Sequence, residues 1–147
     1  MVDVQTETVI RSPLERVAAY AADPDHAPEW YVNIKSVEWQ TPKPLALGSR
    51  IAFQADFLGR RLAYVYEIAE YRPGRLLVMR TADGPFPMET TYVWEPAEGG
   101  STRMLLRNRG NPSGFSRLFA PFMAAMMRRA NRKDLKAIKR ILEGQAR

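Results

Sequence analysis

Residues 113–143, SGFSRLFAPFMAAMMRRANRKDLKAIKRILE, have the pattern of one long amphipathic helix. With a period of about 3.6 residues, one side of this helix is apolar and carries Phe115, Phe119, Phe122, Met126, Ala130, Ala137, Ile138 and Ile141. The other side is basic and carries Arg128, Arg129, Arg132, Lys133, Lys136, Lys139 and Arg140. Pro121 predicts a kink or the effective start of the helix. At about 1.5 Å per residue the helix would extend about 45 Å, which is long enough to cross a whole sheet.

The residues before this helix are predicted to form about seven short strands. Residues 2–10 alternate apolar or threonine side chains with charged and polar ones, as a half-buried strand does. Turn residues then bound six further segments, which are residues 34–41, 49–57, 60–71, 75–81, 88–95 and 102–109. Because a turn follows each segment so closely, we expect the strands to pair with their sequence neighbours in an antiparallel meander.

Two short helices are predicted between the first strand and the second. Ser12 is expected to cap the first helix, and Glu15 to complete a capping box. Asp23-Pro24 ends that helix and begins a second one that runs to Trp30. An antiparallel sheet has one face to bury and the long helix has one apolar side, so the sheet is predicted to curve around the helix. The result is an α+β fold, and 147 residues suit a single domain over residues 1–147.

Composition and charge exclude several classes of protein. The chain has no cysteine, which excludes disulfides and zinc–thiolate sites and favours a cytoplasmic location. It has no signal-peptide pattern and no apolar run near the about 18 residues of a membrane-spanning helix. The net charge of +6 is uneven, because residues 113–147 carry +7 (nine basic, two acidic) and the rest −1 (13 basic, 14 acidic). No nucleic-acid-binding motif accompanies the basic helix, so no nucleic acid partner is expected, whereas contact with an anionic membrane stays open.

Four motifs occur in a particular order along the chain. Residues 10–17 read IRSPLERV, and residues 23–30 contain Asp-Pro followed by Pro-Glu-Trp. Residues 99–103, GGSTR, are similar to a GGTR hairpin with Ser101 inserted, and residues 134–143 read DLKAIKRILE. Together these motifs resemble the polyketide cyclase/dehydrase-like branch of the START-related (SRPBCC) superfamily over nearly the full chain. The resemblance implies a helix-grip fold with a cavity in which family members bind or transform lipids, polyketides, hormones and aromatic compounds.

Strand parity predicts which side chains line that cavity, because alternate residues of a strand share one face. The predicted lining from the strands is Phe53, Phe57, Tyr64, Tyr66, Met88, Thr90, Tyr92, Trp94, Met104 and Leu106. A mostly apolar pocket with a few hydroxyls is typical of a small-molecule site, and the alternative is a closed core. The long helix is predicted to add Phe119, Phe122, Met123 and Met126, either as a flexible lid over the cavity mouth or as ordinary helix core.

Few charged residues are candidates for a site inside the fold. Asp134 falls within the apolar side of the long helix, and it is predicted to be either a polar anchor in the cavity or the partner of a sheet arginine. Arg80 and Arg107 are expected to point outward by default, although an inward arginine could hold a carboxylate ligand. His26 is the only histidine, so neither a metal site nor a Ser-His-Asp triad is expected. No cofactor is expected, and no catalytic residue is assigned.

Three functions follow from these predictions, in order of preference. The first is binding of a small hydrophobic ligand, lipid-, polyketide- or aromatic-like, in an internal cavity. The second is a cyclase or dehydratase that shapes a polyketide-like substrate and transfers protons from tyrosine or aspartate. The third is a lipid shuttle that contacts membranes through the basic helix. The sequence leaves the ligand and the oligomeric state open.

Overall fold

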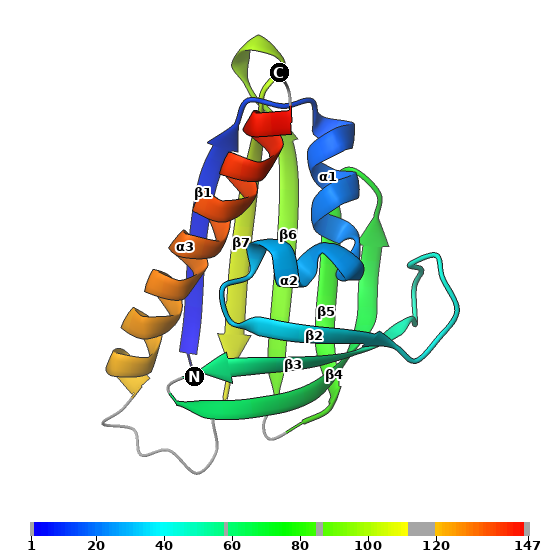
Figure 1. Ribbon diagram of the computed structural model, residues 1–147, viewed down its shortest axis with the longest axis vertical. Helices are drawn as coiled ribbons and strands as arrows, with labels where there is room; N and C mark the ends of the chain where they lie inside the picture. Colours follow the sequence, from blue (N-terminus) through cyan, green and yellow to red (C-terminus); the bar gives the residue numbers. More distant parts are fainter. Residues whose placement is uncertain (1, 58, 85–86, 112–119, 146–147) are drawn as a thin grey trace.

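A computed structural model describes residues 2–57, 59–84, 87–111 and 120–145 of the chain. Its central element is one antiparallel sheet of seven strands in the order β1-β7-β6-β5-β4-β3-β2 (Figure 1). The strands are β1 (Val2–Ile10), β2 (Ile34–Trp39), β3 (Arg50–Phe57), β4 (Arg60–Arg72), β5 (Leu76–Asp83), β6 (Met88–Pro96) and β7 (Thr102–Gly110). Each strand from β2 to β7 pairs with the next along the chain, which confirms the meander, and β1 completes the sheet beside β7.

The helices lie together on one side of the curved sheet (Figure 1). They are α1 (Leu14–Ala22), α2 (Ala27–Trp30) and α3 (Ala120–Gln145), with short 3-10 turns at Pro24–His26 and Glu98–Gly100. α3 packs against β1, and α2 contacts both α3 and β2. This arrangement confirms the predicted α+β fold, in which the sheet curves around the long C-terminal helix. No described helix is long and apolar enough to cross a membrane.

The described part of α3 runs from Ala120 to Gln145, and Pro121 is its second residue. The prediction that Pro121 kinks the long helix or marks its effective start depends on the residues before Ala120 and stays a prediction. The earlier part of the predicted helix, residues 113–119, lies outside the described residues.

The predicted cap of the first helix is wrong. α1 begins at Leu14, so Pro13 rather than Ser12 precedes it, and no side chain caps it. Ser12 is buried, and its carbonyl oxygen accepts a hydrogen bond of 2.8 Å from the Thr102 hydroxyl, while its own hydroxyl has no partner among the described residues. The strand β7 thus holds Ser12 one residue before the capping position, and the capping box with Glu15 does not form.

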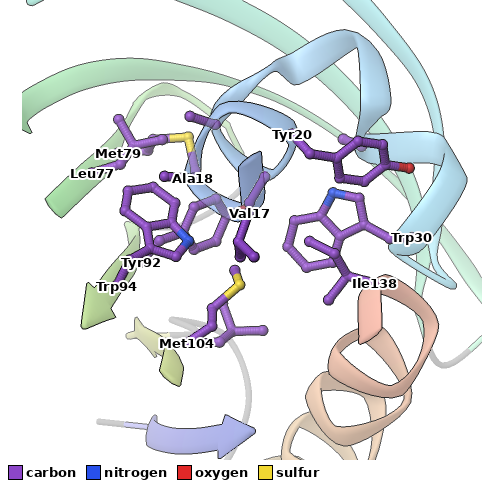
Figure 2. Close-up of a cluster of buried hydrophobic side chains, with 14 of the residues drawn as sticks. Val17, Ala18, Tyr20, Trp30, Leu77, Met79, Tyr92, Trp94, Met104 and Ile138 are labelled. Atoms are coloured by element: carbon purple, nitrogen blue, oxygen red, sulfur yellow. The ribbon is translucent and has the colours of Figure 1, made fainter. Parts of the chain in front are cut away.

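The apolar core fills the half of the molecule in which α3 ends. There α1, α2 and the C-terminal half of α3 pack on the sheet, and the shared cluster includes Val17, Trp30, Trp94, Met104 and Ile138 (Figure 2). Each of these side chains is at most 2% exposed. Burying a large apolar side chain contributes about 1.5–3 kcal/mol, so this half fixes α3 on the sheet. The N-terminal half of α3 has a different neighbour, which is a cavity.

Candidate ligand cavity

The described residues line a partly open cavity of about 140 Å³ beneath the described N-terminal half of α3. Its walls come from β3 to β7, from the end of α1, from the connection between α2 and β2, and from α3. Most of the side chains that line it are apolar or aromatic. The volume is close to the about 150 Å³ of an engineered apolar cavity that takes up benzene.

The cavity brings together a large part of the lining that the sequence predicts. These residues are Phe53, Tyr64, Tyr66, Met88, Thr90, Tyr92, Met123 and Asp134. They come from three strands and one helix, so the meander and α3 together bring side chains from distant parts of the chain to one site. Phe119 and the side chain of Phe57 lie outside the described part of the chain.

Trp94, Met104 and Leu106 do not line the cavity, in contrast to the prediction. They belong to the same buried cluster as Leu135 and Ile138 of α3. Their inward orientation agrees with strand parity, but this part of β6 is covered by α1. Strand parity gives the face of a residue, and it does not say how far along the strand the cavity extends.

Phe122 and Met126 also lie outside the cavity, in contrast to the prediction. Phe122 is 55% exposed, and Met126 is half-buried without lining the cavity. The side of α3 that faces the cavity runs instead through Met123, Met127 and Asn131, which recur every four residues. Such a spacing keeps side chains on one helix face. Phe122 directly precedes Met123 and Met126 directly precedes Met127, so each is rotated by about 100° around the helix axis from the methionine that faces the cavity.

Tyr31 and Asn131 are among the several lining residues that the sequence does not predict. Tyr31 follows α2 directly; its hydroxyl hydrogen-bonds to the Tyr92 hydroxyl, and its ring lies against Trp30 with centroids 4.2 Å apart. Tyr31 lies in an irregular connection, where no periodic pattern marks it. Asn131 lies three residues before Asp134 on the same helix face, and that spacing is the signal that could have revealed it.

A chain of hydrogen bonds runs along one wall of the cavity and ends at Asp134. The Tyr66 hydroxyl lies 2.8 Å from Thr90 Oγ1, which donates to Asn108 Oδ1 at 2.6 Å. Since the Thr90 hydroxyl has only one proton, Tyr66 is the donor to Thr90. Asn108 Nδ2 donates to Asn131 Oδ1 at 3.0 Å, and the amide of Asn131 then hydrogen-bonds to Asp134. Every donor in the chain is therefore directed toward the Asp134 carboxyl group.

Asp134 lies in the cavity wall and is only 2% exposed. Its Oδ1 accepts a hydrogen bond of 2.9 Å from the backbone N–H of Val32. Burial raises the pKa of the carboxyl group from the usual 3.8 to about 7, although the hydrogen bonds from Val32 and Asn131 act to lower it. No described arginine or lysine forms an ion pair with Asp134, so the predicted pairing with a sheet arginine is absent from the described residues.

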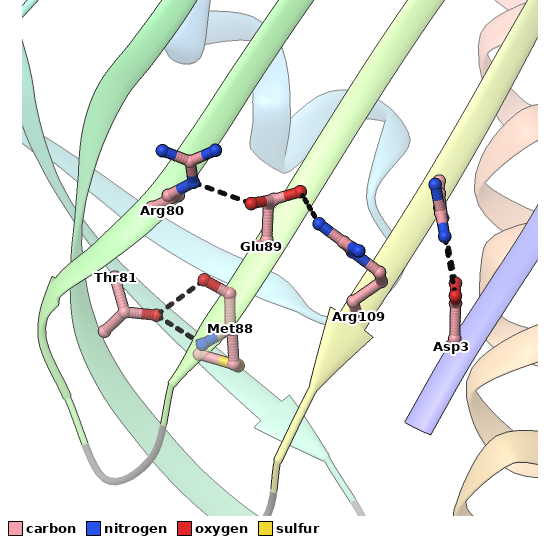
Figure 3. Close-up of polar contacts among 7 residues, drawn as sticks. Asp3, Arg80, Thr81, Met88, Glu89 and Arg109 are labelled. Atoms are coloured by element: carbon pink, nitrogen blue, oxygen red, sulfur yellow. Dashed lines mark hydrogen bonds and ion pairs between the residues drawn. The ribbon is translucent and has the colours of Figure 1, made fainter. Parts of the chain in front are cut away.

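The two arginines that were candidates for holding a carboxylate ligand point away from the cavity. Arg80 Nε donates to Glu89 Oε2 at 2.7 Å, and Arg109 donates to the other oxygen of Glu89 at 2.5 Å (Figure 3). Arg107 donates to both oxygens of Asp3, at 2.9 and 2.7 Å. These cross-strand ion pairs lie on the outer face of the sheet. As a result, the described residues that line the cavity include no lysine, arginine or histidine.

One hydroxyl in the cavity, that of Tyr64, has no hydrogen bond to a described residue. Its ring packs against Phe53 and Tyr66, with centroid distances of 5.5 and 4.9 Å. Burial raises the pKa of Tyr31, Tyr64 and Tyr92 well above the ordinary value of a phenol, and that of Tyr66 to about 12. These phenols therefore stay protonated and can donate hydrogen bonds to a ligand.

The described residues contain no arrangement that would hold a metal ion, since no three His, Cys, Asp or Glu side chains cluster among them. His26 packs against α1 instead. Its ring stacks on Tyr20 with centroids 4.2 Å apart, and its Nδ1 lies 3.1 Å from the Tyr20 carbonyl oxygen. The only histidine is thus part of the packing between the short helices.

The chain belongs to the family described as polyketide cyclase / dehydrase and lipid transport, whose model matches residues 1–143. A comparison with the sequences of curated proteins finds no significant match. The family assignment agrees with the resemblance that the sequence motifs show.

Solved structures share this fold at low sequence identity. The protein TTHA0849 from Thermus thermophilus superposes with a TM-score of 0.84 and 21% identity over 99% of each chain. The Zhui aromatase/cyclase from a Streptomyces species has a TM-score of 0.81 and 15% identity over 99% of this chain and 95% of its own. A START superfamily protein from Mycobacterium smegmatis has a TM-score of 0.80 and 13% identity over 97% of this chain and 98% of its own. These likenesses confirm the START-related helix-grip architecture.

Proposed function

We propose that the protein binds a small, mainly apolar molecule in the cavity under α3. The observation that carries this proposal is a partly open cavity of about 140 Å³ that combines apolar walls with the hydroxyl of Tyr64, which has no hydrogen bond to a described residue. A substituted aromatic ring fits such a volume, as benzene fits a cavity of about 150 Å³. A larger lipid or polyketide needs Met123 and Met127 to move, and the flexible methionine side chain allows this.

The free protein has physical reasons to accept such a ligand. Side chains around an empty cavity lose dispersion contacts on one side, and the Tyr64 hydroxyl has no hydrogen bond to a described residue. A ligand with an apolar body and one hydrogen-bond acceptor restores both interactions. Membership of a family described by polyketide cyclisation and lipid transport supports the same class of ligand.

Filling the cavity tests this proposal. Ala130 lines the cavity, whereas Ala125 is exposed on the same helix. Ala130→Leu therefore adds a leucine side chain inside the cavity, and Ala125→Leu adds the same side chain outside it as a control. We expect Ala130→Leu to lose the binding of benzyl alcohol, measured by NMR titration, while Ala125→Leu binds it as the wild type does. Native mass spectrometry of protein from its natural host should also show a discrete apolar adduct. Equal binding by both variants would contradict the proposal.

A second candidate function is catalysis of a cyclisation or dehydration of a polyketide-like substrate. The observation that favours it is the convergence of Tyr31, Tyr64, Tyr92 and Asp134 on one cavity, since a carboxyl group with a pKa of about 7 suits proton transfer near neutral pH. Asp134→Asn should then lower turnover by about 10²–10⁴-fold with little change in substrate binding. Product analysis with a poly-β-ketone substrate checks this, and unchanged turnover would exclude the role of Asp134.

A third role, contact with an anionic membrane surface, is favoured by the outer side of α3. This basic face consists of six exposed cations without an ion pair to a described residue, namely Arg128, Arg129, Arg132, Lys133, Lys136 and Arg140. Phe122 is exposed at the beginning of the same helix and would add an apolar contact. This role is compatible with ligand binding, because the cavity lies on the opposite side of α3.

A further inference from the structure

The charges inside the cavity have only one sign. The charged side chains among its described lining residues are Asp23 and Asp134, without any lysine, arginine or histidine. Arg80 and Arg107 of the sheet pair with carboxylates on the outer face. A ligand that carries a carboxylate would therefore meet only like charge in this cavity, which disfavours its binding.

Asp134 is the more deeply buried of the two acids, and its surroundings are arranged to solvate a negative charge. It accepts the Val32 N–H at 2.9 Å, and the chain of donors from Tyr66 to Asn131 ends on the same carboxyl group. Such dipoles stabilise the ionised form, but a buried carboxylate without a countercharge remains costly. The described residues supply no countercharge, and a positively charged ligand would supply it.

The walls beside Asp134 also suit a cation. Tyr31 directly precedes Val32, whose N–H donates to Asp134, and the Tyr31 hydroxyl hydrogen-bonds to that of Tyr92. Both tyrosines line the same cavity as Asp134. Aromatic faces attract a cation placed within about 6 Å of the ring centre, and the attraction is stronger when water is excluded. Neutral aromatic rings that share a cavity with a buried carboxylate form a site that matches an ammonium group.

We propose that the natural ligand carries a protonated amine on an apolar body, and that its ammonium group binds beside the Asp134 carboxylate, against Tyr31 and Tyr92. This inference rests on the proposed function, because it names the ligand class of the same cavity. A neutral alcohol or ketone of the same size uses the Tyr64 hydroxyl but leaves Asp134 without a countercharge. A carboxylate is rejected.

The binding of an amine should strengthen as the pH rises through about 7, because only ionised Asp134 attracts the ammonium group and its pKa in the free protein is about 7. Among the described residues, the phenols of the cavity do not change charge in this range. They are Tyr31 from the connection before β2, Tyr64 and Tyr66 from β4 and Tyr92 from β6, whose pKa values burial raises well above it. Asp23, just after α1, is the other acid in the lining.

Three probes with the same aromatic body test the proposal: benzylamine, benzyl alcohol and benzoate. The measurement is an NMR titration that follows the Val32 amide, whose N–H donates to Asp134 and therefore reports on the site directly. At about pH 8 we expect benzylamine to bind at least roughly tenfold more tightly than benzyl alcohol, in line with a hydrogen bond to a charged group. At about pH 6 this advantage should shrink, since Asp134 is then mostly protonated. Benzoate should give no saturable shift.

Two matched variants complete the test. Asp134→Asn keeps an acceptor for Val32 and removes the charge, so it should abolish the preference for the amine over the alcohol. Asp23→Asn removes the other acid of the lining and should preserve the preference. The proposal is overturned if wild type shows no preference for the amine, if benzoate binds as well as the alcohol, or if the preference survives Asp134→Asn.

The two levels of the proposal fail in different ways. If neither benzyl alcohol nor benzylamine binds the wild type, the cavity is not a ligand site and the proposed function fails. If the alcohol binds and the amine binds no better, only the assignment of an amine ligand fails. The wild-type titrations at two pH values decide this even if a variant proves unstable.

Discussion

Burial of Asp134 couples the stability of the protein to pH. The folded protein holds a proton on this carboxyl group up to a pKa of about 7, whereas the unfolded chain releases it near the usual 3.8. Between these values the folded state binds more protons, so the free energy of unfolding decreases as the pH rises. The contribution of protonated Asp134 is complete below about pH 4 and is lost as the pH passes about 7, at about 1.4 kcal/mol per pH unit.

Asp134→Asn should remove this pH dependence. Asparagine does not ionise, so only the wild type loses stability as the pH rises. We therefore expect the free energy of unfolding of the variant minus that of wild type to increase by about 2–3 kcal/mol from about pH 5 to about pH 8. Urea unfolding at both pH values measures the difference. A difference that stays constant with pH would show that the carboxyl group of Asp134 titrates at its ordinary pKa in the folded protein.

Two tyrosines of the cavity should respond differently to loss of their hydroxyl groups. Tyr92→Phe removes the partner of the Tyr31 hydroxyl and leaves it unpaired, so we expect a loss of about 1–2 kcal/mol in the free energy of unfolding. Tyr64→Phe removes a hydroxyl that has no described protein partner, so the free energy should change by less than about 0.5 kcal/mol. Urea unfolding of the two variants compares these effects. Equal losses would contradict the assigned hydrogen bonding.

At the scale of the element, α3 is held at its C-terminal end by Glu143. Its Oε2 accepts hydrogen bonds from Lys139 Nζ at 2.7 Å and from the backbone N–H of Arg11 at 2.9 Å. The hydrogen bond from Lys139, followed by that from Arg11, lowers the pKa of Glu143 to about 2. Lys139 also donates to the Val9 carbonyl oxygen at 2.5 Å, so this end of α3 is attached both to the end of β1 and to Arg11, which follows it.

Glu143→Gln should loosen that attachment. Since the folded pKa is lowered from 4.5 to about 2, ionised Glu143 contributes stability above about pH 4.5 and loses it as the pH falls toward 2. We expect a loss of about 1 kcal/mol at about pH 7 and a smaller loss at about pH 3. Thermal unfolding at both pH values measures it. Glu67→Gln, which breaks an exposed ion pair with Arg50, serves as the control and should cost much less.

The basic face of α3 should govern any binding to membranes. Lys133→Glu combined with Lys136→Glu reverses two exposed charges of this face, and each cation contributes about 1 kcal/mol near an anionic surface. We expect the double variant to lose more than roughly tenfold in affinity for phosphatidylserine-containing vesicles at low salt, as measured by co-sedimentation. Cavity binding of benzyl alcohol should stay unchanged. The control is the double variant Arg50→Glu with Arg72→Glu, which changes the net charge by the same amount but on the sheet. An equal loss of vesicle affinity in this control would argue against a specific role of α3.

At the scale of the whole molecule, the sequence predicts the elements because each has a local pattern. β6 was expected over residues 88–95 and spans Met88–Pro96, since turn residues mark both of its ends. The position of α3 over the sheet follows from the need of both elements to bury one apolar side. Ser12 shows the limit of such reasoning, because a contact with Thr102, far along the chain, decides its position.

The extent of the cavity could not be predicted, because it depends on how α3 lies over the sheet. Leu106 and Asn108 share one face of β7, yet Leu106 belongs to the closed core and Asn108 lines the cavity. The hydrogen-bond chain that ends at Asp134 crosses β4, β6, β7 and α3, and no local pattern connects these elements. Tyr31 lies in an irregular connection, so its place in the wall emerges only from the assembled fold.

The contact between Trp30 and Tyr31 has a practical consequence. Their ring centroids are 4.2 Å apart, and Tyr31 forms part of the cavity wall. Of the other tryptophans, Trp39 lies on the edge strand β2 and Trp94 lies within the closed core. Indole emission changes with the polarity and motion of its neighbours, so a guest that contacts Tyr31 alters the fluorescence of Trp30 most directly. The protein thus contains its own optical reporter of cavity occupancy, and ligands can be screened without attaching a dye.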